Sequence, residues 1–326
     1  MAVEKKNVYQ IVTERFMAQL REGVVPWSKP WFSVNGIRTG AWSHSRGITY
    51  SLLNQMMLPG PGEYCSYKDV QKEGGQLKKG AKGYPVVFWK MYRTEVKDSE
   101  TNRTEIKNVP VLRYYTVYRV ADCEGVSYNY APDTSALDSL KEPGKCKIAE
   151  DVANAYIKMS GVKYTNVPGD KAYYQPLFDE VVLPLRKQFN TKVEYYSTLY
   201  HELVHSTGSR ERLNRLFTHT GSRGKDYSLE ELVAEIGAAA CMYEFRLETK
   251  DSIKNSNAYL QGWLRALEND SRMIVKAASR AEKAVRYIFK GPDGIRPNND
   301  WKKVDFSEPV SHVEIPEIDS FEEAPF

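Results

Sequence analysis

Hydrophobic residues recur at helical spacing near the start of the chain and at strand spacing further along. Between residues 4 and 23, apolar side chains three or four positions apart predict an amphipathic helix, which Gly23 and Pro26 end. Residues 84–92 and 109–120 are rich in β-branched and aromatic residues, and they predict two strands joined by a long polar hairpin loop. The other elements predicted in this half are a helix at 51–57 and a helix with a turn at 64–75.

The second half predicts several helices around a few strands. Its pattern favours helices at 148–160, 193–206, 228–245, 258–269 and 271–289, and strands at 163–164 and 172–183. The fold class expected is therefore α+β, with a boundary between residues 121 and 135. We expect a mixed α/β domain over residues 1–130, a second domain over 131–290, and an acidic, disordered tail over 291–326.

Composition narrows the class of protein. The chain of 326 residues, 41% of them hydrophobic, is long enough for two domains with cores of their own. It contains no apolar run near the roughly 20 residues that span a bilayer, and its first residues do not resemble a secretory signal. The four cysteines lie far apart and form no CxxC pair. We therefore expect a cytoplasmic protein without membrane contact.

Charge is distributed unevenly along the chain. Residues 1–120 carry 19 basic and 10 acidic side chains, a net charge of +9. Residues 304–326 carry seven acidic and no basic side chains. A basic N-terminal half favours contact with nucleic acid, although a solvated basic surface is an equally good explanation of charge alone.

The most informative motif is His-Glu-Leu-Val-His at residues 201–205. On a helix, His201 and His205 share one face and can bind one metal ion. Glu202 then faces a water bound to that ion and can accept its proton as the catalytic base. Gly208 is predicted to end this helix in the left-handed conformation. The alternative is a pair of surface histidines on an ordinary helix.

A third ligand is expected from the helix that Ser228 opens. Glu231 is the predicted ligand, although it also fits a capping box with Ser228; Glu230 is the next candidate. Glu235 lies one turn further on and is predicted to accept a hydrogen bond from the free ring nitrogen of His201. The sequence leaves open the reverse assignment, with Glu235 on the metal. Two histidines and one carboxylate leave a position for water, as in catalytic sites for one Zn²⁺ or another divalent ion.

Residues around this motif add weaker candidates. The strand at 172–177 is predicted to pair with an extended peptide substrate, or to be ordinary sheet core. His219 and Tyr227 lie between the two metal-binding helices, where they could stabilise an oxyanion; a surface loop is the default for both.

The N-terminal half mixes aromatic and cationic residues. Sixteen aromatic residues are interleaved with the 19 basic ones in residues 1–120. Alternation along the second strand places Arg113, Tyr115 and Arg119 on one face. Because only one face is expected to be core, the other exposes rings and cations, which suits single-stranded DNA. Taken singly, each ring is more often core than a platform for a base.

Two further segments are candidates for DNA contact. The loop at residues 78–83 offers Lys78, Lys79 and Lys82 with flexible backbone amides suited to phosphate. A preceding loop rich in Trp, Pro and Gly supplies Trp27 and Trp31 as further rings. We also expect residues 1–130 to bind single-stranded DNA when expressed alone.

The order of these features resembles the ArdC-type antirestriction proteins of conjugative plasmids. The resemblance rests on the segments 23–31, 47–50 with Asn54, 79–83, Tyr173-Tyr174, Asp179, 183–184, 201–208 and 230–239. It implies an N-terminal domain that binds single-stranded DNA and a C-terminal SprT-like zincin domain. It also implies a role in protecting incoming DNA from host restriction.

Three functions remain open at this point. The first is a DNA-binding antirestriction protein with a zinc metallopeptidase domain acting on an unknown protein substrate. The second is a protease for DNA–protein crosslinks that single-stranded DNA targets. The third is a DNA-binding protein whose metal site is purely structural.

The acidic C-terminal segment carries a prediction of its own. Residues 318–326 end in Glu-Glu-Ala-Pro-Phe, which resembles the tail of bacterial single-stranded-DNA-binding protein. In such a tail an aromatic ring fills an apolar pocket while acids contact a basic rim. Host proteins that read such tails are candidate partners, and a solvated acidic tail is the alternative.

Overall fold

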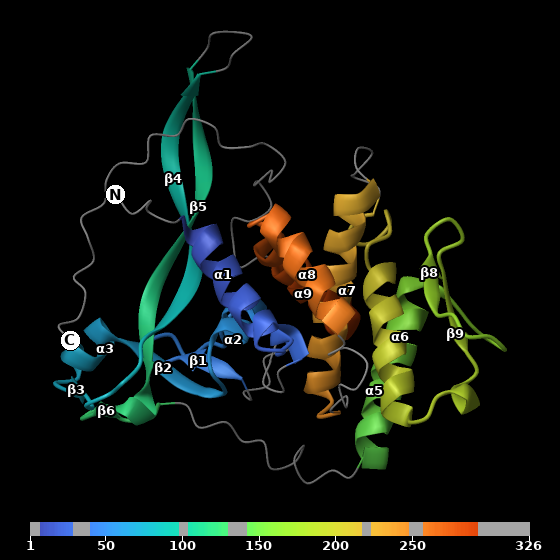
Figure 1. Ribbon diagram of the computed structural model, residues 1–326, viewed down its shortest axis with the longest axis horizontal. Helices are drawn as coiled ribbons and strands as arrows, with labels where there is room; N and C mark the ends of the chain where they lie inside the picture. The colour runs from blue at the N-terminus through green and yellow to red at the C-terminus, as the bar shows by residue number, and fades with distance from the viewer. Residues whose placement is uncertain are drawn as a thin grey trace.

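The molecule places a β-sheet with a long hairpin at one side, helices in the middle and a small sheet at the far side (Figure 1). It is a computed structural model that describes residues 7–28, 40–97, 104–129, 142–216, 223–247 and 257–292. Within these ranges no helix has the length and apolar character needed to cross a membrane.

The first half forms a four-stranded sheet with helices beside it. Its elements are α1 (Val8–Arg21), η1 (Pro26–Ser28), β1 (Ala41–Ser43), α2 (Leu52–Met57), β2 (Gly62–Ser66), α3 (Tyr67–Lys72), β3 (Gln76–Leu77), β4 (Tyr84–Lys97), β5 (Thr104–Arg119), η2 (Val120–Asp122) and β6 (Cys123–Glu124). The sheet order is β1-β2-β5-β4, with β1 and β2 parallel and the other pairs antiparallel. Strands β3 and β6 form a separate antiparallel pair.

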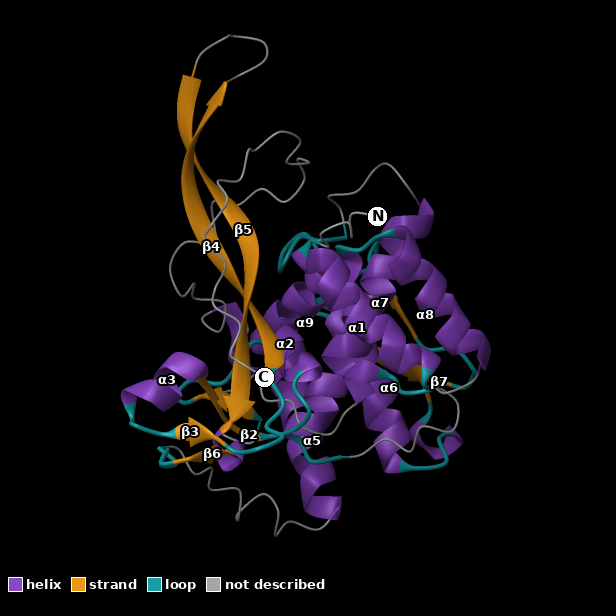
Figure 2. Ribbon diagram, turned by 60° about the vertical axis from the view of Figure 1, so that its left-hand side comes forward, coloured by secondary structure: helices purple, strands orange, loops and turns teal. Residues whose placement is uncertain are grey.

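The sequence predicted α1, α2 and the two long strands, and it missed the short strands. The predicted helix at 64–75 begins only at Tyr67, because residues 64–66 pair with β5 and gain backbone hydrogen bonds there. The hairpin loop is also shorter than predicted, since the pairing continues to Lys97 opposite Thr104. The hairpin extends away from the rest of the molecule (Figure 2).

The second half is mainly helical. Its elements are α5 (Glu142–Ser160), β7 (Lys163–Val167), β8 (Tyr173–Gln175), β9 (Glu180–Pro184), η3 (Arg186–Gln188), α6 (Lys192–Ser206), α7 (Arg223–Glu244), α8 (Asn257–Asn269) and α9 (Met273–Lys290). The small sheet has the order β7-β9-β8, so β8 is an edge strand. The single strand predicted at 172–183 is two strands, because the chain turns at residues 176–179.

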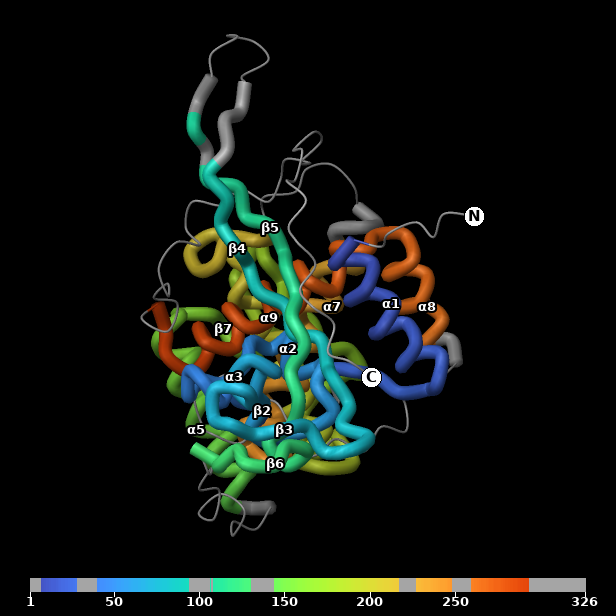
Figure 3. The backbone as a smooth tube through the Cα atoms, turned by 90° about the vertical axis from the view of Figure 1, so that its left-hand side faces the viewer, coloured from blue at the N-terminus to red at the C-terminus, as the bar shows by residue number. Residues whose placement is uncertain are grey.

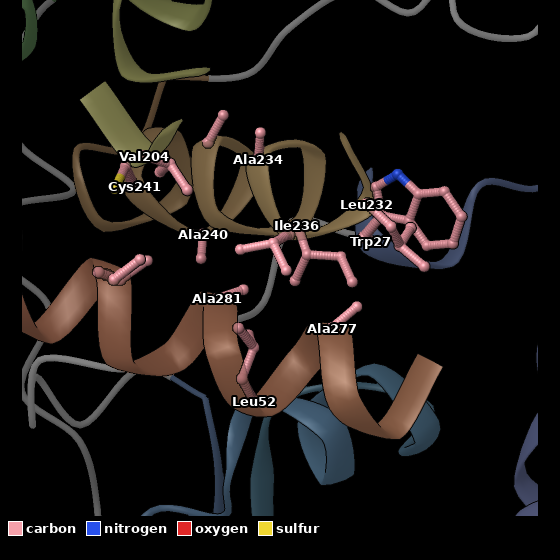
Figure 4. Close-up of a cluster of buried hydrophobic side chains, with 14 of the residues drawn as sticks. Trp27, Leu52, Val204, Leu232, Ala234, Ile236, Ala240, Cys241, Ala277 and Ala281 are labelled. Atoms are coloured by element: carbon pink, nitrogen blue, oxygen red, sulfur yellow. The ribbon is translucent and has the colours of Figure 1, made fainter. Parts of the chain in front are cut away.

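The two halves share one buried hydrophobic cluster. Side chains of α1, η1 and α2 belong to the same cluster as those of α5, α6, α7, α8 and α9. Leu52 of α2 lies on the far side of α9 from α7, and Trp27 lies at one end of the cluster (Figure 4). Trp27 is 1% exposed and meets Trp263 edge to face, with ring centroids 5.7 Å apart.

This shared cluster bears on the expectation that residues 1–130 bind single-stranded DNA when expressed alone. A fragment ending at residue 130 would expose the apolar side chains that α1, η1 and α2 bury against the second half. The DNA-binding experiments below therefore use the full chain.

Candidate metal centre and nucleic-acid interface

Helices α6 and α7 bring three potential metal ligands together. His201 and His205 lie one turn apart on α6, with their Nε2 atoms 3.2 Å from each other. Glu231 lies on α7. One of its carboxylate oxygens, Oε2, is 3.6 Å from His201 Nε2, and the other, Oε1, is 3.6 Å from His205 Nε2. All three donor atoms lie within 4.8 Å of one another. The predicted ligand set is thus assembled in space.

These donors fit a divalent ion. Nitrogen and oxygen ligands about 2.0–2.1 Å from a tetrahedral ion lie roughly 3.3 Å apart, close to the separations found here. Two imidazoles and one carboxylate are ligands that zinc and other first-row divalent ions accept. They would hold the ion on three sides and leave a fourth position for water or substrate.

Close packing of the two helices keeps the ligands in reach. A Cβ added at Gly237 on α7 would lie 2.8 Å from a methyl carbon of Val204 on α6, so only glycine allows this approach. Gly208 also acts by close packing: a Cβ there would lie 2.8 Å from Leu216. The prediction that Gly208 ends α6 in the left-handed conformation is wrong, because its φ is not positive.

The capping box proposed for Glu231 does not form. Helix α7 begins at Arg223, so Ser228 lies inside the helix rather than at its N-cap. Glu231 therefore faces the histidines. Burial raises the pKa of Glu231, but the close contact with His201 and the charges of both histidines lower it more, so its pKa lies below the usual range.

Glu230 lies on the outer side of His205 rather than among the ligand atoms. Its carboxylate is 3.4 Å from His205 Nδ1 and accepts hydrogen bonds from Arg215 at 2.8 and 3.0 Å. Arg215 is 7% exposed and also donates to Thr207 at 2.7 Å. A carboxylate at the second ring nitrogen fixes the orientation of a metal-binding histidine. Glu230, the next candidate for the third ligand after Glu231, is thus not in the described ligand group, and the sequence offered no signal for Arg215.

Glu235 lies on the His201 side of the centre. Burial lowers the pKa of His201, but the close contact with Glu231 and the charge of Glu235 are among the effects that raise it above its ordinary value. The described ligand group contains Glu231 and not Glu235. The hydrogen bond predicted between Glu235 and His201 stays a prediction.

Glu202 is placed to accept a proton. It is 7% exposed, and strand β8 packs against the helix α6 that carries it. Burial raises the pKa of Glu202 above its ordinary value, and the nearby charge of Glu231 raises it further. A carboxylate with a raised pKa is a more effective general base near neutral pH.

Tyr227 borders the same site. Its side chain is 67% exposed and lies near the carboxylate of Glu231. The charge of Glu231 raises the pKa of Tyr227, which keeps the hydroxyl protonated. His219 lies outside the described residues.

Substitutions at these residues should weaken metal binding to different degrees. We expect His201→Ala or His205→Ala to abolish tight binding, and Glu231→Ala to weaken it more than Glu235→Ala. Removal of an outer hydrogen-bond partner such as Glu230 or Glu235 should cost about 10- to 100-fold in affinity. Titration of the metal-free full chain with Zn²⁺ and Mn²⁺ measures this order, and a larger effect of Glu235→Ala than of Glu231→Ala would reverse the assignment.

The hairpin carries the nucleic-acid candidates predicted on β5. Tyr115 and Arg113 lie on one face, opposite Val86 and Phe88 of β4. Phe88 is 38% exposed and meets Tyr115 edge to face at 5.6 Å. The cations of Lys90 and Arg113 lie 5.1 and 5.5 Å from the ring centre of Tyr92. These five residues (Phe88, Lys90, Tyr92, Arg113, Tyr115) form the hairpin patch.

The expectation that only one face of this strand is core is wrong at the base of the hairpin. Val86 and Val117 are buried in one cluster, and Val87 and Leu112 are buried in another on the opposite face. The hairpin is covered where it meets the body and extends outward from there (Figure 3). Tyr114, opposite Val87, is nevertheless 46% exposed.

The other predicted DNA contacts differ in accessibility. Lys78, Lys79 and Lys82 are exposed, and Lys78 Nζ donates to the carbonyl of Ala121 at 2.8 Å. Arg119 is half-buried and donates to the Tyr64 hydroxyl at 3.3 Å. The prediction that Trp27 contacts DNA is wrong, because its ring is buried between the two halves and cannot stack on a base. Trp31 and the acidic tail lie outside the described residues.

A buried ionic cluster that the sequence did not reveal lies in the first half. His44 is 2% exposed; its Nδ1 contacts Glu63, and its Nε2 lies 2.5 Å from Glu73. The backbone N–H of Asn129 donates to both oxygens of Glu63 at 3.1 Å. The cluster therefore ties residue 129 to the sheet.

Comparison with known proteins agrees with this arrangement. Residues 6–118 match the model of the N-terminal domain of anti-restriction factor ArdC, and residues 151–280 match a zincin-like metallopeptidase model. The metal-free crystal structure of the antirestriction ArdC protein from plasmid R388 is 31% identical, with a TM-score of 0.64. The match covers 87% of this chain and 97% of that one.

The chain belongs to the ArdC antirestriction family. It has the ArdC-type N-terminal domain followed by a zincin-like metallopeptidase domain. A second crystal structure of the R388 ArdC protein contains Mn(II); it is 28% identical, with a TM-score of 0.63. The ligand set and this relative indicate a divalent metal site.

Longer proteins contain a related segment. DNA primase TraC of Escherichia coli is 32% identical over 294 residues, which are 87% of this chain but 20% of that protein. A second TraC primase of the same organism is 30% identical over 28% of its length. This chain thus spans between a fifth and a third of the TraC primases it matches. An uncharacterised protein of Sinorhizobium fredii, y4eC, is 28% identical over 91% of its length.

Proposed function

We propose that this ArdC-family chain is a cytoplasmic antirestriction protein that binds single-stranded DNA and hydrolyses peptide bonds with one divalent ion, Zn²⁺ or Mn²⁺. The observation that carries the hydrolytic part is the convergence of His201, His205 and Glu231 beside the buried Glu202. A structural metal site needs four protein ligands and no base, whereas the described residues bring together three potential ligands beside a buried carboxylate. This contrast favours chemistry over a purely structural role.

Each part of the site has a separate role in the proposed hydrolysis. A divalent ion bound here would act as a Lewis acid that makes a coordinated water easier to deprotonate. Glu202 accepts that proton and can pass it to the leaving amine. Tyr227, whose hydroxyl stays protonated, donates a hydrogen bond toward negative charge that develops on the scissile carbonyl. Strand β8, an unpaired edge beside Glu202, can align an extended substrate by main-chain hydrogen bonds.

The experiment follows hydrolysis in the full chain. Purified protein loaded with Zn²⁺ or Mn²⁺ is incubated with and without single-stranded DNA, and self-cleavage is followed by mass spectrometry, with His201→Ala as the variant without a complete site. We expect cleavage that requires metal and His201. Equal cleavage by wild type, His201→Ala and chelator-treated protein would overturn the hydrolytic proposal.

The DNA-binding part rests on the hairpin patch and the exposed lysine loop. Rings and cations side by side match single strands, in which bases stack on aromatic rings while phosphates meet cations. Four buried cysteines without a disulfide among the described residues agree with a reducing compartment. The protein substrate, and any partner of the acidic segment, stay predictions.

Neutralising the lysine loop should change how salt affects binding. We expect replacement of Lys78, Lys79 and Lys82 by glutamine to lower the slope of log affinity against log salt by up to about 0.7 for each phosphate that the variant no longer neutralises. Fluorescence anisotropy with a labelled oligothymidylate at several salt concentrations measures the slope. Replacement of Lys158, Lys171 and Lys187, exposed lysines of the second half, is the matched control.

Removing a ring from the hairpin patch should affect DNA binding differently from neutralising the lysine loop. Phe88→Ala should weaken binding by about 1–3 kcal/mol, because one base loses a stacking surface, and should leave the salt slope unchanged. Equal affinity of the wild type for duplex and single strands would remove the stacking argument.

A further inference from the structure

Three large apolar side chains are exposed on and just after the edge strand β8. Leu177 is 83% exposed, Phe178 is 53% exposed and Tyr173 is 44% exposed. Single exposed hydrophobic residues are normal, but a cluster within six positions marks a binding surface. Leu177 and Phe178 belong to the turn at residues 176–179, here called the apolar turn.

The apolar turn is held in place from beneath. Arg212, whose side chain is 2% exposed, pairs with both carboxylate oxygens of Asp179, one of them at 3.0 Å. The hydroxyl of Tyr174 donates to the same carboxylate at 2.7 Å. Asp179 has a φ of +49°, a conformation that costs energy outside glycine and that its surroundings must enforce. A turn fixed this firmly presents Leu177 and Phe178 to solvent instead of folding them inward.

The same network reaches the proposed general base. Tyr174 donates its side-chain hydroxyl to Asp179, and its strand β8 packs against α6, the helix that carries Glu202. Strand β8 is at the edge of the small sheet, so no described strand pairs with its side away from β9. An extended chain lying along this edge passes Glu202 and continues beside the apolar turn. The exposed apolar residues are thus attached to the reaction site through one strand.

We propose that the apolar turn selects the substrate of the metal site, and that the substrate class is an extended protein segment with large apolar side chains. This inference rests on the proposed hydrolytic function. An edge strand requires an extended partner, and Leu177 with Phe178 requires an apolar one. Folded proteins bury large apolar side chains, so the segment comes from an unfolded or locally unfolded protein.

The test measures binding without turnover. The full chain carrying Glu202→Gln and loaded with Zn²⁺ is titrated into two fluorescein-labelled ten-residue peptides of Gly and Ser, one with a central Leu-Phe pair and one with a central Ser-Asn pair. We expect about 10-fold or greater preference for the Leu-Phe peptide, as burial of one or two such side chains would give. Adding Leu177→Ser and Phe178→Ser should reduce that preference to about 2-fold or less.

A matched control removes apolar surface elsewhere in the same half. Met159 and Val167 are 45% and 37% exposed, and replacing both with serine should leave the preference intact. No preference in the parent, or an unchanged preference in the Leu177→Ser/Phe178→Ser variant, would overturn the inference. Absence of metal-dependent cleavage would instead count against the proposed hydrolysis, and the peptide preference is measured independently of it.

Discussion

Replacing Glu202 with glutamine is expected to leave the bound metal in place and to slow hydrolysis by about 10²- to 10⁴-fold. The amide keeps the size of the side chain, but it cannot accept the proton. None of the three proposed metal ligands is altered. Metal content by mass spectrometry and cleavage rate, measured on the same sample, give the two results.

A matched variant separates removal of the base from removal of a charge. Glu211→Gln removes an exposed carboxylate a short distance beyond α6, and it should affect neither metal content nor rate. Retained activity in Glu202→Gln would rule Glu202 out as the base. Retained metal in a wild type that never cleaves would favour the function in which the metal is structural.

Replacing His44 with alanine should cost about 3–5 kcal/mol of folding free energy, because it leaves the buried Glu63 carboxylate without its cation. The Glu63 side chain is 1% exposed, so water cannot replace the missing partner. Urea unfolding of the metal-free full chain, followed by circular dichroism, measures the change. His44→Gln keeps a hydrogen-bond donor and should lose less stability.

The His44 cluster also predicts a pH dependence of stability. Burial lowers the pKa of His44, but hydrogen bonds and charges from Glu73 and Glu63 raise it more, so its pKa in the folded protein lies above the ordinary value. Its contribution is then complete below about pH 6.5 and is lost as pH rises through the raised pKa. The wild type should lose its advantage over His44→Ala in alkaline solution, and parallel curves at every pH would contradict this.

Local patterns predicted the metal helix well. His201 and His205 fall on one helix face through spacing alone, and Glu231 was the preferred candidate, beside Glu230 and Glu235, for a third ligand on the next helix. The strand break at residues 176–179 was not predictable, because the Arg212–Asp179 pair that fixes it joins residues 33 positions apart. The role of Glu230 was missed for a similar reason, since Arg215 holds it from a loop.

In the first half, too, the sequence patterns did not predict contacts between residues far apart along the chain. Trp27 looked like a platform for a base because it lies in a loop rich in Trp, Pro and Gly, yet its ring fills a space that only the helices of the second half complete. His44 gave no signal, since its acidic partners lie 19 and 29 residues away. The hydrophobic period and the composition of a segment describe single elements. The surroundings of Trp27 and His44 depend instead on how distant elements pack together.

The buried contact between the halves also bears on how such chains diversify. Trp27 against Trp263 and Leu52 against α9 are complementary shapes, so a change on one side requires a matching change on the other. Recombination that joined the first half of one lineage to the second half of a distant one would bring together surfaces that do not fit. We therefore expect the halves to be inherited as a pair, and the match to TraC extends over 87% of this chain.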